Sequence, residues 1–333
     1  MNGLLFIDDE EGVRRSIARA LKKSSYPIHT VKNGEEGIEF IKTHLHDITT
    51  VISDYKMPGL DGMETLAAIG ALNPGITRIL LTGYATMEAA INATNEGLDG
   101  FLTKPFDNLE LRAKIHEIMV HKHLRQFIPE QIYREIDNSP EALQPRFNEV
   151  SVLFSDIRGF TRMSGTAPPE KIADFLNTHY FSPMGEIAYT FNGTMDKHIG
   201  DSIMVVFGSP VTHDDDAVRA VESAIAMQIK AGRIDQHLAS EDGLRLKVGI
   251  GIATGTVFSG ILGSLRKKEF SSIGMAVNIA SRLQAMAGAG EILISEETYL
   301  KIEGRLDAIA LPPVMIKGID EPITVYKVNY QNP

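Results

Sequence analysis

The chain has 333 residues, of which 43% are hydrophobic, a formal net charge of −10 and no cysteine. This length exceeds a typical domain, so we expect two domains joined by a connector. The acidic balance disfavours a nucleic-acid-binding protein, and the missing cysteines exclude disulfides and thiolate metal sites. The N-terminal MNGLLFIDDEE lacks the pattern of a signal peptide, and no uncharged apolar run approaches the ~18 residues of a membrane span. We therefore expect a cytoplasmic protein without membrane insertion.

Short apolar runs alternate with amphipathic segments over the first 120 residues. The expected strands are residues 3–9, 28–32, 49–55, 78–83 and 100–104. Repeated β-α units predict a five-stranded, doubly wound parallel sheet. The polar residues at its strand ends are Asp8, Asp9, Asp54, Thr82 and Lys104. Since ligands of such sheets bind at the carboxyl ends of the strands, we expect these groups to converge, with a divalent cation joining the carboxylates.

The motifs IDDEE, ISDYKMPGLDG, LLTGYA and FLTKPF make residues 1–120 resemble the receiver domain of two-component response regulators. The resemblance implies that Asp54 is phosphorylated by a sensor histidine kinase or a phosphotransfer protein. It implies one Mg²⁺ (or Mn²⁺), held by Asp8, Asp9, Asp54 and the carbonyl of Lys56. The residues implied to respond to the phosphoryl group are Thr82, Lys104 and the switch aromatic Phe101.

Residues 121–148 are expected to form a helical connector. An apolar stripe that ends at Leu124 continues from the last receiver helix, and Pro129 suits the first turn of a second helix. The stripe is too short to identify a coiled coil. Two interpretations stay open: a terminal helix packed on its own domain, and a rod that pairs two chains and carries a signal.

A second pattern begins at about residue 149, where SVLFSDIRGFT (151–161) reads as a strand that ends at Asp156. A helix is expected over residues 169–181, and GTMDKHIGDSIMVVFG (193–208) after it reads as a β-hairpin with Asp201 in its turn. Pairing this hairpin beside residues 151–155 would place Asp201 next to Asp156. Two carboxylates beside a helix start form the protein half of a two-metal phosphoryl-transfer site.

Three further segments complete the pattern. LRLKVGIGIATGTVFSG (244–260) is a strand rather than a dinucleotide motif, because its glycine spacing differs from G-x-G-x-x-G. KEFSSIGMAVNIASRLQAMA places Asn278 and Arg282 four residues apart, on one helix face. VMIKGIDEPITVYKV (314–328) reads as a hairpin with Lys317 before its turn.

The motifs FSDIRGFT, DKHIGDSIMVVFG, IGMAVNIASRL and IKGIDEPITVY occur in this order. On these motifs, residues 149–329 resemble the catalytic domain of class III adenylyl and guanylyl cyclases. The resemblance implies an α+β fold with a palm-type, mostly antiparallel sheet. It also implies a head-to-tail homodimer whose active sites are each built from two chains.

The resemblance gives each motif residue a role. From one chain, the implied ligands of two divalent ions, Mg²⁺ or Mn²⁺, are Asp156, Asp201 and the carbonyl of Ile157. From the other, Lys197 and Ser271 would read the base, and Asn278 and Arg282 would stabilise the transition state. The implied phosphate contacts are Lys317 and, more weakly, Lys247.

Lys197 favours ATP over GTP, because adenine presents an acceptor at N1 and a donor at N6. Ser271 can accept from N6 but stands where ATP-using relatives mostly have Asp or Thr. The expected protein is an adenylate cyclase that makes 3′,5′-cyclic AMP and pyrophosphate and is gated by phosphorylation of Asp54. The alternatives are a guanylate cyclase of the same fold, an inactive nucleotide-binding or dimerisation module, and an enzyme whose receiver serves only as a dimerisation block.

Overall fold

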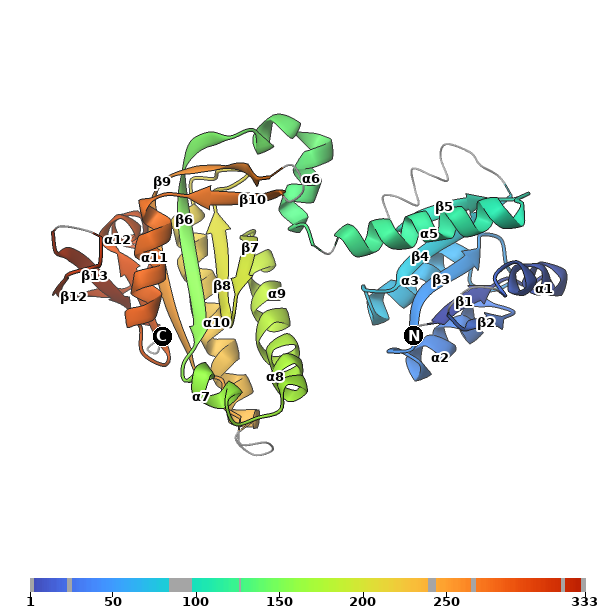
Figure 1. The fold of residues 1–333 in the computed structure, drawn as a ribbon, viewed down its shortest axis with the longest axis horizontal. Helices are drawn as coiled ribbons and strands as arrows, with labels where there is room; N and C mark the ends of the chain where they lie inside the picture. Colours follow the sequence, from blue (N-terminus) through green and yellow to red (C-terminus); the bar gives the residue numbers. More distant parts are fainter. Residues whose placement is uncertain are drawn as a thin grey trace. The chain divides into compact units, whose positions relative to one another are not determined.

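The computed structural model describes residues 3–22, 26–83, 98–125, 127–238, 244–264, 268–318 and 321–330. The chain divides into two compact units, residues 1–127 and 128–333, each with its own sheet (Figure 1). No helix in these described ranges is long and apolar enough to cross a membrane.

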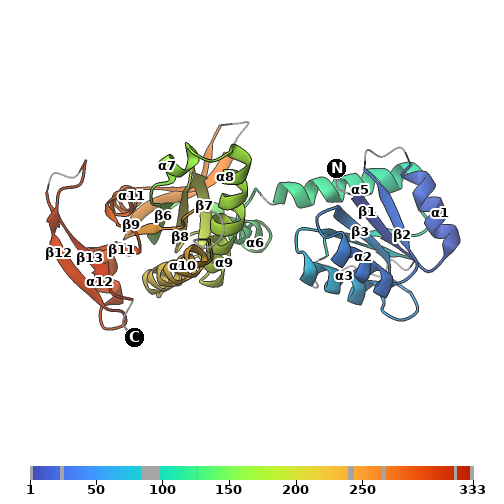
Figure 2. The same cartoon turned by 90° about the horizontal axis from the view of Figure 1, so that it is seen from below.

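The first unit contains the predicted five-stranded parallel sheet, in the order β2-β1-β3-β4-β5. Its strands are β1 (Gly3–Ile7), β2 (Ile28–Val31), β3 (Ile48–Asp54), β4 (Thr77–Thr82) and β5 (Gly100–Thr103). Its helices are α1 (Glu11–Ala20), α2 (Gly34–Thr43), α3 (Gly62–Leu72) and α5 (Asn108–Arg125). Alternation along β1 directs Leu4 and Phe6 toward α1 and α5, and Leu5 and Ile7 toward α2 and α3. Helices therefore cover both faces (Figure 2).

The second unit is built on an eight-stranded sheet in the order β12-β13-β11-β9-β6-β8-β7, with β10 paired to β9. Its strands are β6 (Arg146–Ile157), β7 (Thr194–Ile199), β8 (Ser202–Phe207), β9 (Val248–Gly263), β10 (Lys268–Ile273), β11 (Glu291–Ser295), β12 (Ala308–Val314) and β13 (Ile323–Val328). Among the strand pairs that the described residues of this unit form, β9–β11 alone is parallel. The predicted mostly antiparallel α+β architecture is confirmed.

Alternating residues of β6 divide the second unit into two cores. Leu153 packs with α8 (Pro169–Phe175), α9 (Ser182–Thr190) and α10 (Asp216–Leu238). Val152 and Phe154 face the other way, toward α11 (Met275–Met286). Two shorter helices of this unit are α7 (Phe160–Ser164) and α12 (Glu296–Ile302). As β6 ends between these two layers, the residues that follow it lie at an edge of the sheet.

The helix expected over residues 169–181 differs in detail from the structure. It is α8 followed by a π-helical segment, Leu176–Phe181, which continues into α9. Tyr180 of this segment is fully buried, and its hydroxyl lies 2.9 Å from the hydroxyl of Ser155 in β6. The π-helical segment thus places the Tyr180 hydroxyl in contact with Ser155, near the end of β6.

The connector contains two helices, as the sequence predicts. The helix α5 runs to Arg125, and α6 (Glu130–Asn138) follows Pro129 directly. A short 3₁₀ turn, Pro140–Leu143, then leads into β6, which begins at Arg146. Ile132 of α6 is buried, and α6 packs beside β7, so this second helix belongs to the second unit.

Candidate functional site

The strand ends of the first unit bring a lysine between two carboxylates. Lys104, just after β5, places Nζ 3.0 Å from Asp8 Oδ2 and 2.6 Å from Asp54 Oδ1. Asp8 is fully buried and Asp54 is 8% exposed. Because β1, β3 and β5 are parallel strands of one sheet, these three residues meet although they are distant in sequence.

The carboxylates at this edge of the sheet carry more negative charge than Lys104 alone neutralises. Burial raises the pKa of Asp8, although Lys104 opposes the shift. Burial also disfavours the charge on Lys104, but its hydrogen bonds to Asp54 and Asp8 outweigh that effect and raise its pKa. Asp9 is exposed, and its side chain has no hydrogen bond or ion pair within the described part of the chain. Asp8 and Asp54, which meet at Lys104, offer carboxylate oxygens of the kind that a divalent ion such as Mg²⁺ prefers.

The other predicted receiver residues occupy the same edge or the neighbouring strand. Thr82 ends β4 and is buried, and Lys56 follows β3 and is exposed. Phe101 lies in β5 with 40% of its surface exposed, so the predicted switch aromatic faces outward in this structure.

The second unit brings Asp156 and Asp201 together, as the predicted pairing requires. Antiparallel pairing of β6 with β8 sets Asp156 beside the β7–β8 turn, in which Gly200 has φ +65°. Asp156 accepts hydrogen bonds of 2.5 Å from Ser202 Oγ and from Arg158 Nη2. Burial and the negative charge of Asp156 raise the pKa of Asp201, against a hydrogen bond from the backbone N–H of Ile157.

This acidic pair fits ions that keep several water ligands. The described residues contain no group of three or more His, Asp or Glu side chains able to hold a metal. Mg²⁺ is commonly held by one or two carboxylates together with substrate phosphates, and such a site needs no larger group. Asp156, Asp201 and the Ile157 carbonyl are the ligands that this edge can offer.

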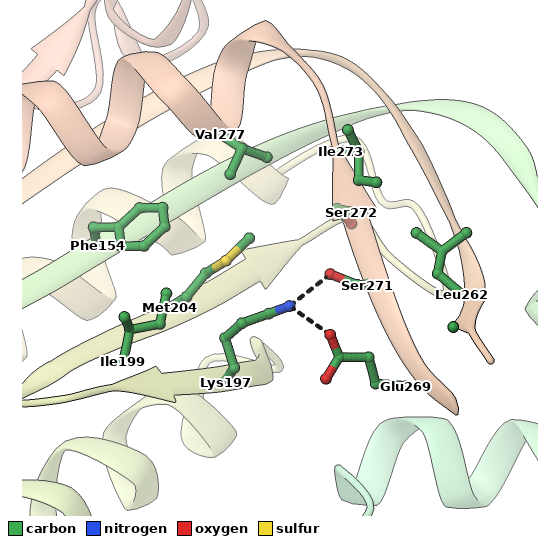
Figure 3. A pocket seen from close by; sticks show the side chains of 11 residues that line it. Phe154, Lys197, Ile199, Met204, Leu262, Glu269, Ser271, Ser272, Ile273 and Val277 are labelled. Carbon is green, nitrogen blue, oxygen red and sulfur yellow. Dashed lines mark hydrogen bonds and ion pairs between the residues drawn. The ribbon is translucent and has the colours of Figure 1, made fainter. Parts of the chain in front are cut away.

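A pocket of about 450 Å³ opens beside β7, β8 and β10 (Figure 3). Its apolar lining is formed by Phe154, Ile199, Met204, Leu262, Ile273 and Val277. Lys197 points into it from β7, with Nζ 3.0 Å from Ser271 Oγ and 3.2 Å from Glu269 Oε1. An apolar pocket with a few converging polar groups is typical of small-molecule sites.

The other predicted cyclase residues have no side-chain hydrogen bond or ion pair with Asp156, Asp201 or Lys197 among the described residues. Asn278 and Arg282 lie one turn apart on α11, and their exposed side chains have no hydrogen bond or ion pair to any described residue. Lys317 is exposed in the β12–β13 connection. Lys247 places Nζ 3.7 Å from Asp235 of α10, in a different pocket from Lys197.

Several polar neighbours of the site were not predicted from the sequence. Arg158 and Ser202 contact Asp156, and Glu269 contacts Lys197. The sequence could have indicated them, because Arg158, Ser202 and Glu269 lie within two residues of the predicted site residues Asp156, Asp201 and Ser271, respectively. Asp196, whose Oδ2 lies 3.3 Å from Ser271 Oγ, gave no such signal, because strict alternation along a strand would direct it away from Lys197.

Comparisons with known proteins agree with these two units. Residues 143–329 match the family profile "Adenylate and Guanylate cyclase catalytic domain", and residues 4–116 match "Response regulator receiver domain". The fold and the two polar clusters thus define a class III nucleotide cyclase with a receiver domain. The chain belongs to the family of adenylate and guanylate cyclase catalytic domains.

Relatives of both nucleotide specificities resemble the second unit. An adenylate cyclase of Anabaena cylindrica is 35% identical over 188 residues, which are 54% of this chain and 36% of the relative. The crystal structure of the adenylyl cyclase CyaB from P. aeruginosa is 37% identical with a TM-score of 0.54, and 56% of this chain covers 96% of it. The guanylyl cyclase Cya2 is 33% identical with a TM-score of 0.53, and 55% of this chain covers 92% of it. The chain therefore spans only about a third of the Anabaena cyclase.

Proposed function

We propose that this protein is an adenylate cyclase whose activity is controlled by its receiver domain. It would convert ATP to 3′,5′-cyclic AMP and pyrophosphate. The observation that carries this proposal is the Lys197–Ser271 pair, 3.0 Å apart in an apolar pocket. The lysine offers a proton to adenine N1, and the serine oxygen accepts one from the N6 amino group.

The acidic pair would hold two divalent ions, Mg²⁺ or Mn²⁺, through Asp156, Asp201 and the Ile157 carbonyl. When bound, such ions activate the ribose 3′-hydroxyl and neutralise the leaving pyrophosphate. Arg158 balances part of the charge on Asp156, to which it is ion-paired. Ser202 fixes the orientation of the same carboxylate through its hydrogen bond.

The reaction is an in-line displacement: the 3′-oxygen forms a bond to the α-phosphorus, and the bond from phosphorus to the pyrophosphate oxygen breaks. Arg282 would contact the equatorial oxygens through its planar guanidinium, and Asn278 would add a neutral donor. Lys317 would hold the terminal phosphates, and Lys247 offers a second ammonium near the turn at Arg158, whose N–H donates to the Lys247 carbonyl.

The active site would be shared by two chains in a head-to-tail homodimer. Asn278 and Arg282 have no partner among the described residues of their own chain. Exposed polar groups of this kind suit an interface in which the substrate and the metal-binding carboxylates come from a second copy. A closed dimer of this type contains two equivalent sites.

Control would act through phosphorylation of Asp54 by a histidine kinase or a phosphotransfer protein. A phosphoryl group on Asp54 would compete for Lys104, which already contacts both Asp54 and Asp8. Thr82 and Phe101 lie on neighbouring strands, β4 and β5, where a shift at the strand ends can reach them. The receiver would then change how the catalytic units pair.

One observation favours guanylate cyclase activity as the second candidate. Glu269 places a carboxylate in the pocket of Lys197, and guanine offers N1–H and N2 donors to a carboxylate. Glu269 is paired with Lys197 and its side chain is 56% exposed, so its charge is screened by solvent. Adenylate cyclase activity therefore remains the proposal.

The test is product formation by the full chain with Mg²⁺ or Mn²⁺, with ATP and GTP offered separately, with and without beryllofluoride as a phosphoryl mimic. We expect cyclic AMP at a rate that the mimic changes. Cyclic GMP as the main product would contradict the base assignment. No cyclic product from a confirmed dimer would contradict the catalytic assignment, and cyclic AMP insensitive to the mimic would contradict the control.

A further inference from the structure

An irregularity in β7 places two consecutive side chains against the same serine. The pairing of β7 with β8 shifts register between Met195 and Lys197, so that Asp196 is an extra residue in the strand. Such a β-bulge turns a side chain out of the normal alternation. As a result Lys197 Nζ lies 3.0 Å from Ser271 Oγ, and Asp196 Oδ2 lies 3.3 Å from the same atom.

These two contacts determine which hydrogen-bonding role the Ser271 hydroxyl retains. A hydroxyl has one proton to donate and two lone pairs to accept. Ser271 donates its proton to Asp196, which as a carboxylate can only accept, and one lone pair receives the Lys197 ammonium. The hydroxyl has then only a lone pair left to offer to a ligand in the pocket.

We propose that Asp196 is a specificity-determining positioning residue, which fixes Ser271 as a hydrogen-bond acceptor toward the purine. This inference rests on the proposed adenylate cyclase activity and names the basis of its base selection. The N6 amino group of adenine donates to the free lone pair. The O6 atom of guanine would meet that lone pair with its own, and Ser271 would have no proton left to offer it.

The surroundings of Asp196 hold the carboxylate in this role. Its side chain is 4% exposed, and Oδ1 is buried without a hydrogen-bond partner among the described residues but lies 3.9 Å from Lys197 Nζ. A buried charge is costly unless it is paired and hydrogen-bonded, and Lys197 and Ser271 supply these contacts to Asp196. Burial raises the pKa of Asp196 to about 6, so the carboxylate is mostly ionised, and accepts only, at neutral pH.

The test is the replacement Asp196→Asn in the full chain. The asparagine amide N–H can donate to Ser271 Oγ, which frees the serine proton to meet guanine O6. We expect the ratio of kcat/KM for ATP to that for GTP to fall at least about tenfold, because a reversed hydrogen bond in a buried site strongly changes discrimination. Ser271→Ala removes the hydroxyl through which Asp196 is proposed to act. In that background, adding Asp196→Asn should leave the ATP-to-GTP ratio of kcat/KM unchanged within about twofold, because the effect of Asp196 depends on its coupling to Ser271.

Glu269→Gln is the matched control, because Glu269 also contacts Lys197 but its side chain has no hydrogen bond to Ser271 within the described part of the chain. We expect it to change the ratio less than Asp196→Asn does. A ratio within about twofold of wild type for Asp196→Asn, or an equal fall in the Ser271→Ala background, would overturn the inference.

Affinities for 3′-deoxy-ATP and 3′-deoxy-GTP separate this inference from the proposed function. These nucleotides lack the attacking hydroxyl, so calorimetric titration measures base selection without turnover. A wild-type chain that makes no cyclic AMP but prefers 3′-deoxy-ATP, with that preference lost in Asp196→Asn, would contradict the activity and support the role of Asp196. If the wild-type chain makes cyclic AMP and Asp196→Asn leaves the ratio of the two affinities unchanged, the activity is supported and the role of Asp196 is contradicted.

Discussion

Gln131 of α6 donates a hydrogen bond of 2.7 Å from Nε2 to the carbonyl of Gly193, directly before β7. The same strand carries Lys197 into the pocket and places Asp196 against Ser271, which lines it. The helix α6 follows the receiver in the chain, so this bond ties the connector to a strand of the candidate active site. Through this contact, a movement of the connector can reach the strand that carries Lys197.

We expect Gln131→Ala to weaken the response to phosphorylation. The substitution removes the side-chain contact between α6 and Gly193 and leaves the polar residues of the pocket in place. The ratio of cyclase rates with and without beryllofluoride should move toward one. Gln144→Ala is the control, because Gln144 is exposed outside α6. An undiminished ratio in Gln131→Ala would show that this contact carries no signal.

Arg282→Ala should lower kcat by about 10²–10³ while changing nucleotide affinity little, because the guanidinium acts on charge that develops in the transition state. Since Arg282 is exposed and without an intrachain partner, the Tm should stay within the range of ordinary surface substitutions. Steady-state kinetics and titration with 3′-deoxy-ATP separate the two effects. Arg305→Ala, another exposed arginine of the second unit, should have wild-type kinetics. Unchanged turnover in Arg282→Ala would remove Arg282 from the mechanism.

Two inactive variants should complement each other if the sites are shared. Asp201→Asn damages the metal-binding half and Arg282→Ala the other half. In a mixed dimer one site receives both defects and the other receives none. Equal mixing gives about half mixed dimers with one working site each, so activity should recover to about a quarter of wild type. Activity no higher than the sum of the separate variants would contradict the composite site.

The sequence predicts the meeting of Asp54 and Lys104 because parallel strands bring their carboxyl ends to one edge. It likewise predicts that Asp201 lies next to Asp156, because a hairpin turn beside an antiparallel strand leaves few alternatives. The bulge at Asp196 was beyond prediction, because one extra residue in a strand changes no hydrophobic pattern. The π-helical segment around Tyr180 was missed for a similar reason, as its apolar spacing also fits an α-helix. The hydrophobic pattern and the packing place the site residues but do not assign their catalytic roles, which we infer from the chemistry of the side chains.

Divalent cations should stabilise the receiver through Asp9. At a Mg²⁺ concentration of 100 times the dissociation constant, the gain in the free energy of unfolding is about 2.7 kcal/mol. Asp9→Ala should abolish most of this gain but leave the Tm in EDTA unchanged, because the Asp9 side chain is exposed and unpartnered. Glu10→Ala, at the neighbouring exposed position, should keep the full gain. Calorimetry of the receiver transition measures both, and an equal Mg²⁺ effect in Asp9→Ala would exclude that ligand.

The raised pKa of Asp196 predicts a pH-dependent stability difference. Burial sets this pKa to about 6 in the folded chain, against an ordinary value of 3.8, with Lys197 and Ser271 lowering it and Glu269 raising it. Between about pH 4 and pH 6 the folded state binds more protons than the unfolded state, so the free energy of unfolding falls as the pH rises. Above about pH 6 this loss is complete, and it amounts to about 1–3 kcal/mol.

Asp196→Asn lacks this titration, so its Tm relative to wild type should be higher at about pH 8 than at about pH 5, by several degrees. Comparing the Tm difference between variant and wild type at the two pH values cancels every pH effect that the two proteins share. Asp215→Asn is the control that should show no such difference, because a hydrogen bond from Arg219 lowers the pKa of Asp215, and its carboxylate is ionised in the folded and unfolded states at both pH values. Calorimetry of the full chains at both pH values measures the difference. A constant offset between Asp196→Asn and wild type would mean that Asp196 has the same pKa folded and unfolded, and hence that the bulge does not bury its charge.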